Sequence, residues 1–231
     1  MIRMSFHLVL MLLVGLSGCA GTQHARYVKQ SGFLGDYSIL KEGEKDETLL
    51  IYKNPQADWK RYKKIMLDPV TLWIGKDSQL NDVSGEDRQR MADLFYAKLH
   101  EALKTDYEIV KSPGPDVMHM QVAITEAESS NPVLDTVSSI IPQLRLLTGA
   151  KGVATGVSGF TGSASVEMKV TDSSDKTLLA AAVDRRGGTK TLRGVTNSWN
   201  DVEEAFRYWA EKISWRACLL RGGIGCVEPE A

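Results

Sequence analysis

Hydrophobic residues recur at helical spacing in two stretches of the chain. The first follows Ser84, which with Asp87 three residues later is typical of a helix start, and consists of Met91, Phe95, Leu99 and Leu103. The second follows Ser198, ends before Gly222-Gly223, and consists of Val202, Phe206, Trp209, Ile213, Ala217 and Leu220. Each stripe predicts a helix with one face against a core.

Other stretches alternate between apolar and polar residues and predict strands. Residues 118–125 place Met118, Met120, Val122 and Ile124 on one face, and residues 164–170 place Glu167 and Lys169 on the outward face. A turn at 172–175 predicts that residues 177–183 return as the hairpin partner. Residues 107–110 predict a short strand. The apolar run 65–74 contains Pro69, which indicates a strand near a sheet edge or with a bulge.

Residues 33–62 have a less regular pattern, in which small apolar islands at 33–34 and 49–52 interrupt polar stretches. We expect an extended arm lying on the domain, with a solvated loop where charges mix at Lys41–Glu47. The order of all these elements predicts an α+β fold. It consists of a small antiparallel or mixed sheet with the helices packed on one face.

Composition supports an ordinary globular domain, since 43% of the 231 residues are hydrophobic and 25% are charged. The formal net charge of -1 argues against nucleic acid as a partner, because such proteins carry a strong basic excess. We expect a single α+β domain at 33–231, with an apolar and glycine-rich insert at 131–162. A tether at 19–32 precedes it.

The first 18 residues follow the pattern of a bacterial export signal. Arg3 precedes a short apolar run that cannot span a bilayer, and small residues lead to Cys19. Residues 16–19, Leu-Ser-Gly-Cys, resemble a lipobox, which implies cleavage before Cys19 and attachment of lipid to its thiol. Three acyl chains would hold the protein stably to a membrane. Ala20 and Gly21 follow, without an inner-membrane retention aspartate, so we expect a periplasm-facing anchor in the outer membrane.

Two further cysteines, Cys218 and Cys226, form an even pair near the C-terminus. In an oxidising periplasm such a pair is a disulfide candidate, and the alternative is two free thiols.

Five segments of the chain resemble an uncharacterised proteobacterial lipoprotein family that is known only as a domain of unknown function. They cover most of the mature chain, and the resemblance implies no activity. The segments are residues 32–38, 62–70, 166–172 and 178–188, followed by Trp199, Ala205, Trp209 and Ala210.

Residue types with catalytic or metal-binding chemistry are scattered. The four histidines lack metal-ligand spacing, and we predict no catalytic residue, metal or cofactor. Glu126 and Glu128 lie two apart on one strand face and are the best candidate acid/base pair, although strand-end carboxylates are usually only solvated. Arg185 and Arg186 either clamp an anionic partner or supply charge at a strand end.

The insert begins with residues 131–148, where Leu134, Val137, Ile141 and Leu144 have helical spacing before a glycine-rich loop. This segment either covers the core or docks a partner or membrane. Our leading hypothesis is therefore a membrane-anchored, non-enzymatic binding or accessory module that contacts an envelope protein. The alternatives are an envelope-polymer hydrolase that uses Glu126 and Glu128, and a carrier of a small apolar ligand.

Overall fold

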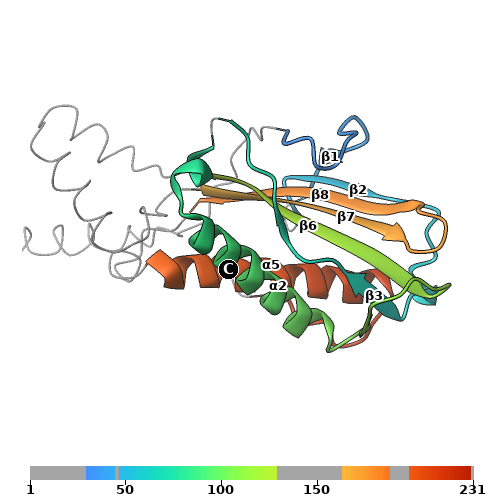
Figure 1. The fold of residues 1–231 in the computed structure, drawn as a ribbon. Coiled ribbons are helices and arrows are strands. Elements are labelled where there is room, and N and C mark those ends of the chain that lie inside the picture. Colours follow the sequence, from blue (N-terminus) through green and yellow to red (C-terminus); the bar gives the residue numbers. More distant parts are fainter. Residues whose placement is uncertain (1–29, 45–46, 77, 129–162, 188–197, 230–231) are drawn as a thin grey trace, which may run out of the picture.

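An eight-stranded mixed sheet carries two long helices, α2 and α5, on the same face (Figure 1). The computed structural model describes residues 30–44, 47–76, 78–128, 163–187 and 198–229. The arrangement confirms the predicted α+β class with helices on one sheet face.

The strands follow the order β1-β2-β8-β7-β6-β3-β5, and β4 also pairs with β6. Helix α2 spans Gly85–Leu103, helix α5 spans Ser198–Leu220, and two 3-10 turns are η1 (Trp59–Arg61) and η2 (Gln79–Asp82). The strands are β1 (Lys41–Glu42), β2 (Leu50–Lys53), β3 (Lys64–Leu67), β4 (Thr71–Leu72), β5 (Glu108–Val110), β6 (Val117–Glu128), β7 (Ser163–Asp172) and β8 (Leu178–Gly187).

The three long strands β6, β7 and β8 form the antiparallel centre of the sheet. Val122 of β6 pairs with Met168 of β7, which in turn pairs with Ala182 of β8. Because alternate residues face opposite ways, Met118, Met120 and Ile124 of β6 turn toward the helices and join the core. The predicted faces of both alternating strands are confirmed.

Strands β3 and β4 pair with β6 in parallel, and β3 also pairs with β5 in parallel. Pro69 lies between β3 and β4, where it donates no hydrogen bond, so the predicted single strand is divided in two. The strand lies near a sheet edge as predicted, because β3 is next to the edge strand β5 and, among the described strands, β4 pairs only with β6. Helix α2 connects β3 to β5 and supplies the crossover that parallel neighbours require.

The segment 33–62 contains more sheet than predicted. Residues 50–53 form β2, which pairs with β8, and Lys41–Glu42 form β1 at the edge of the sheet. The expectation of a solvated loop at Lys41–Glu47 is therefore wrong at both ends, since Glu47 is also buried. The predicted arm is confined to the residues before β1.

The helices meet the sheet through an aromatic cluster. Phe95 of α2 stacks on Phe206 of α5 at 4.7 Å between ring centroids, and Trp209 lies 6.0 Å from Phe95. All three side chains are buried. Ser84 caps α2 as predicted, because its hydroxyl oxygen accepts a hydrogen bond from the Asp87 N–H at 3.0 Å.

After α5 the chain turns through Gly222 and Gly223, and a disulfide joins Cys218 to Cys226. The disulfide predicted from the cysteine pair is thus present. Among the described residues, none of the helices has the length and apolar character needed to cross a membrane.

Candidate functional site

The sheet face opposite the helices is partly covered by an arm loop, residues 30–40, that closes over Glu167 of β7. Tyr37 donates a hydrogen bond from its hydroxyl to Glu167 Oε2 at 2.6 Å, and the Ser31 N–H donates to Oε1 at 3.2 Å. Burial and the Glu167 hydrogen bond raise the pKa of Tyr37. Glu167 points outward as predicted, yet it is fully buried because the arm loop covers it.

A second buried carboxylate, Asp172, ends β7. Tyr62 donates a hydrogen bond to Asp172 Oδ2 at 2.9 Å, and Arg61 contacts the same oxygen at 2.7 Å. Burial opposes ionisation of Asp172, but the Ser174 N–H, the Tyr62 hydroxyl and the Arg61 charge outweigh it and lower the pKa. Burial and the neighbouring carboxylate raise the pKa of Tyr62 to about 12.

A third buried carboxylate, Asp184 of β8, lies on the helix face. Trp209 of α5 donates its indole N–H to Asp184 Oδ2 at 2.8 Å. Arg186 lies 3.9 Å from the same oxygen, and its guanidinium lies 3.2 Å from the centroid of the Tyr208 ring. The guanidinium of Arg186 is therefore engaged within the protein.

All three carboxylates accept a hydrogen bond from an aromatic side chain that is distant in sequence. Each partner lies in one of the segments that carry the family resemblance. Since a buried acceptor is costly unless it is hydrogen-bonded, these pairs hold the arm loop, β7 and α5 in place. These three carboxylates are therefore engaged in hydrogen bonds that stabilise the fold.

A largely apolar cavity, partly open to the surface, lies beside α5, and we call it the α5 cavity. It has a volume of about 220 Å³ and lies between the C-terminal half of α5 and strands β2, β6, β7 and β8. Its apolar lining includes Ile51, Met118, Met120, Met168, Ile213 and Leu220. A concave apolar site with a few polar groups is the usual form of a small-ligand site.

Small side chains create the α5 cavity. Ala180 and Ala182 are the helix-facing residues of β8 at this point, and Ala217 faces them from α5. Further along the same helix, Phe206 and Trp209 fill the corresponding space. The methionines that line the remainder are flexible and adapt to irregular contents.

Charged groups gather at one side of the α5 cavity around Glu47. Lys53 Nζ lies 2.6 Å from Glu47 Oε1, and Lys212 Nζ donates to the Glu47 carbonyl at 3.4 Å. Burial would raise the pKa of Glu47, but the hydrogen bonds from Lys53 and the Glu44 N–H, with the charges of Lys53 and Arg216, lower it below the ordinary value. Among the described residues that line the cavity, three basic side chains, Lys53, Lys212 and Arg216, stand beside a single carboxylate, Glu47.

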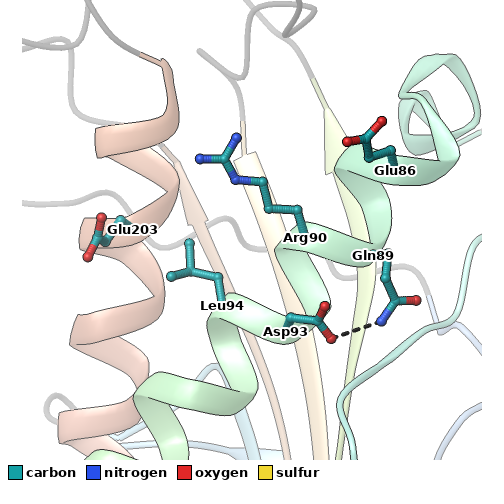
Figure 2. Close-up of a pocket in the computed structure, with 6 residues that line it drawn as sticks. All are labelled: Glu86, Gln89, Arg90, Asp93, Leu94 and Glu203. Atoms are coloured by element: carbon teal, nitrogen blue, oxygen red, sulfur yellow. Dashed lines mark hydrogen bonds between the residues drawn. The ribbon is translucent and has the colours of Figure 1, made fainter.

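A larger groove of about 700 Å³ lies on the surface between α2 and α5 (Figure 2). Its lining is mostly charged: Arg90 and Leu94 of α2 extend toward α5, while Gln89 bonds to Asp93 on α2 itself at 2.9 Å. Glu203 of α5 pairs with Lys98 at 2.6 Å, and this hydrogen bond and charge lower the pKa of Glu203. The groove is a solvated seam between helices, and the α5 cavity is the better ligand site.

Most residues predicted to act in function lie outside the described residues. These are Cys19 and the four apolar residues of the insert, Leu134, Val137, Ile141 and Leu144. Glu126 and Glu128 end β6, where they pair with Ser165 and Ser163, and their side chains are outside the described part. Arg185 and Arg186 are adjacent on β8 and therefore face opposite sides of the sheet.

The sequence pattern did not lead us to predict the charged residues of the α5 cavity as site residues. Lys212 and Arg216 lie four residues apart, beside the apolar stripe of α5, and this spacing was the available signal. In the described part of the chain, no three His, Cys, Asp or Glu side chains group in a way that could hold a metal ion.

Among solved structures, the chain is similar to several bacterial proteins at low identity. A PelC dodecamer from Paraburkholderia phytofirmans shares 9% identity over 75% of this chain and 95% of that one, with a TM-score of 0.38. A DUF330 protein from Xanthomonas campestris shares 13% identity over 74% and 91%, with a TM-score of 0.38. A DUF4136 protein from Bacteroides thetaiotaomicron shares 14% identity over 74% and 95%, with a TM-score of 0.37.

None of the curated proteins matches the chain. One family model does match, over residues 29–213, which extends from the arm loop to the last turns of α5. Its description is "Protein of unknown function (DUF3313)", and it covers all five segments that carried the resemblance. The chain belongs to the DUF3313 family.

Proposed function

We propose that this protein is a lipid-anchored, non-enzymatic binding module of the bacterial envelope, and that it holds a small apolar ligand in the α5 cavity. The observation that supports this proposal is the cavity itself, a largely apolar hollow between α5 and the sheet that is partly open to solvent. A concave, mostly apolar lining with a few polar groups is the usual form of a small-ligand site. The volume of the cavity is below the ~300–1,000 Å³ of drug-sized ligand sites, so the ligand portion is small.

The envelope location rests on two features at opposite ends of the chain. The sequence at residues 16–19 has the lipobox pattern, and Cys218 and Cys226 form a disulfide. Disulfides persist in oxidising compartments such as the periplasm and are rare in the cytosol. Both features therefore support an exported protein held at a membrane by lipid on Cys19.

A non-enzymatic role is supported by the use of the buried carboxylates. Glu167, Asp172 and Asp184 each bond to aromatic donors that hold the fold together. The alternative hypothesis, an envelope-polymer hydrolase, assigns catalysis to Glu126 and Glu128. Replacing both with glutamine should leave the cellular phenotype intact, and loss of the phenotype in a folded double variant would favour the enzyme.

An envelope protein as partner is the second candidate, and a specific surface favours it. Ile224, in the loop closed by the disulfide, is 103% exposed, Val227, which directly follows Cys226, is 81% exposed, and Leu219 of α5 is 45% exposed. Exposed apolar groups on a constrained loop are typical docking points. In-cell crosslinking with Ile224→Asp and Ile141→Asp, against Ser174→Asp as control, would show which apolar segment contacts a partner.

The experiment for the ligand site uses 1-octanol, a neutral apolar probe. Methyl NMR of the methionines should show saturable shifts at Met118, Met120 and Met168, which line the cavity, and none at Met91. Ala217→Phe should fill the space and abolish these shifts. Ala205→Phe, on the same helix outside the lining, is the matched control. Unchanged methyl positions at saturating octanol would contradict the proposed function.

A further inference from the structure

The charged side chains at one side of the α5 cavity indicate which chemical class of ligand it would bind. Lys212 is only 7% exposed and lines the cavity. Among the described residues, its ammonium donates one long hydrogen bond, to the Glu47 carbonyl at 3.4 Å. The same nitrogen lies 5.6 Å from the centroid of the Tyr208 ring. An ammonium carries three donors, so Lys212 retains capacity to bind an acceptor.

The nearby carboxylate does not use this capacity. Glu47 Oε1 is held by Lys53 at 2.6 Å, and Oε2 accepts from the Glu44 N–H at 3.1 Å. Lys212 reaches only the main chain of Glu47. Burying a cation such as Lys212 is costly unless an anion or strong acceptor meets it. Arg216, whose charge also acts on Glu47, lines the same cavity.

We propose that the α5 cavity binds a small anionic amphiphile, with its chain among the methionines and its charged group against Lys212 and Arg216. This inference rests on the proposed function and specifies the ligand class of the same site. A volume of about 220 Å³ corresponds to roughly seven methylene-sized groups, if each takes up nearly as much space as a water molecule, about 30 Å³. A single short chain fits this volume.

The geometry separates the two parts of such a ligand. The sheet contributes the chain site through Met118, Met120 and Met168, while the charged group meets α5 at Lys212 and Arg216, one helical turn apart. A carboxylate or phosphate there would form charge-assisted hydrogen bonds, which are about twice as strong as neutral ones. The anion therefore adds affinity that an apolar chain alone lacks.

The test compares three probes of equal chain length on the full chain carrying Cys19→Ala, so that no attached acyl chain competes. The probes are octanoate, 1-octanol and octylammonium, each titrated while the methyl signals of Met118, Met120 and Met168 are followed. We expect octanoate to bind about tenfold or more tightly than octanol, as a hydrogen bond to a charged group allows, and octylammonium to bind least.

Variants assign the effect to the cations. Lys212→Gln should weaken octanoate about tenfold and leave octanol unchanged, while Lys212→Arg retains tight octanoate binding. Lys98→Gln, on α2 outside the cavity, is the matched control. If Lys212→Gln does not fold, Arg216→Gln carries the same expectation.

The outcomes distinguish this inference from the proposed function. Octanol binding that equals octanoate binding, or indifference of octanoate to both cation variants, overturns the anionic ligand and leaves the apolar site standing. Absence of binding by all three probes overturns the apolar site as well.

Discussion

At the scale of single residues, three buried carboxylates are each matched to an aromatic donor from a remote segment. Glu167 meets Tyr37, Asp172 meets Tyr62, and Asp184 meets Trp209. Strand alternation was sufficient to predict that Glu167 points outward. Its burial was not predictable, because the covering arm loop lies 130 residues earlier in the chain. A local pattern gives the direction of a side chain and says nothing of what covers it.

The hydroxyl of Tyr37 should contribute measurably to stability. Tyr37→Phe removes the 2.6 Å hydrogen bond and leaves the buried Glu167 with the Ser31 N–H as its remaining described donor. We expect the free energy of unfolding to fall by about 1–3 kcal/mol, the cost of an unsatisfied buried group. Urea denaturation measures this loss. Tyr96→Phe, on α2, is the control, and an equal effect of both variants would contradict the role of Tyr37.

Two buried tyrosines should make the fold sensitive to alkali. Burial and Asp172 raise the pKa of Tyr62 to about 12, and burial raises that of Tyr107 to about 12 despite the opposing charge of Arg221. Below the unfolded pKa of about 10 their stabilisation is fully present, and it is lost as pH rises from 10 to 12. Each contributes up to about 3 kcal/mol, at ~1.4 kcal/mol per pKa unit.

The measurement is urea denaturation at pH values between 9 and 12 for the parent and for Tyr62→Phe with Tyr107→Phe. The parent should lose stability steeply across this window, and the double variant should start lower and decline less. Parallel curves for the two proteins would mean that other groups cause the alkaline loss.

At the scale of elements, the long periodic segments and the short strand β5 were predictable, whereas the short strands β1 and β2 were not. Helices α2 and α5 and the β6, β7 and β8 strands follow from stripes and alternation. Strand β2 has four residues in a charged surrounding, and its membership of the sheet comes from pairing with β8. Likewise, Ala180 and Ala182 have the pattern of ordinary strand residues. Only the packing of α5 over them shows that their small side chains line the cavity. Tertiary contacts decide such elements.

The disulfide belongs to this scale because it ties the tail to the last turn of α5. The closed loop from Cys218 to Cys226 is short, so the chain-entropy model predicts a stabilisation of about 2–3 kcal/mol. We expect Cys218→Ser with Cys226→Ser to lower the free energy of unfolding by this amount. Reduction of the parent should give the same value, which urea denaturation with and without reductant measures.

Thiol labelling provides an independent check. Unfolded, non-reduced protein that carries Cys19→Ala should take up no label, and the same protein after reduction should take up a label at Cys218 and at Cys226. Label on the non-reduced protein would show that the bridge does not form in cells.

At the scale of the whole molecule, one sheet separates two different surfaces. The helix face holds the aromatic core and the α5 cavity, and the opposite face is partly covered by the arm loop (Figure 1). The order of elements predicted this layering, since helices that flank alternating strands need one common apolar face. The parallel pairing of β3 was not predicted, because it depends on the crossover through α2.

The arm loop also limits how far the domain could lie from a membrane if lipid is attached at Cys19. Among the described residues, contacts with the domain begin at Ser31, whose N–H bonds to Glu167 and whose carbonyl accepts from the Trp73 indole at 2.8 Å. If lipid is attached at Cys19, about eleven residues connect the membrane to this first contact, and at ~3.3 Å per extended residue they allow at most roughly 40 Å of separation. The domain would therefore work close to the membrane surface.

Lipid on Cys19 is the anchor that we propose. Cys19→Ala removes the thiol that would be lipidated, so we expect the protein to remain in the soluble periplasmic fraction, or unprocessed in the inner membrane, instead of fractionating with the outer membrane. Fractionation followed by immunoblotting measures the distribution, and Cys218→Ser with Cys226→Ser serves as a control that alters cysteines without altering the anchor. Outer-membrane fractionation of Cys19→Ala equal to that of the parent would mean that a contact other than lipid, such as the exposed Ile224 and Val227, holds the domain there.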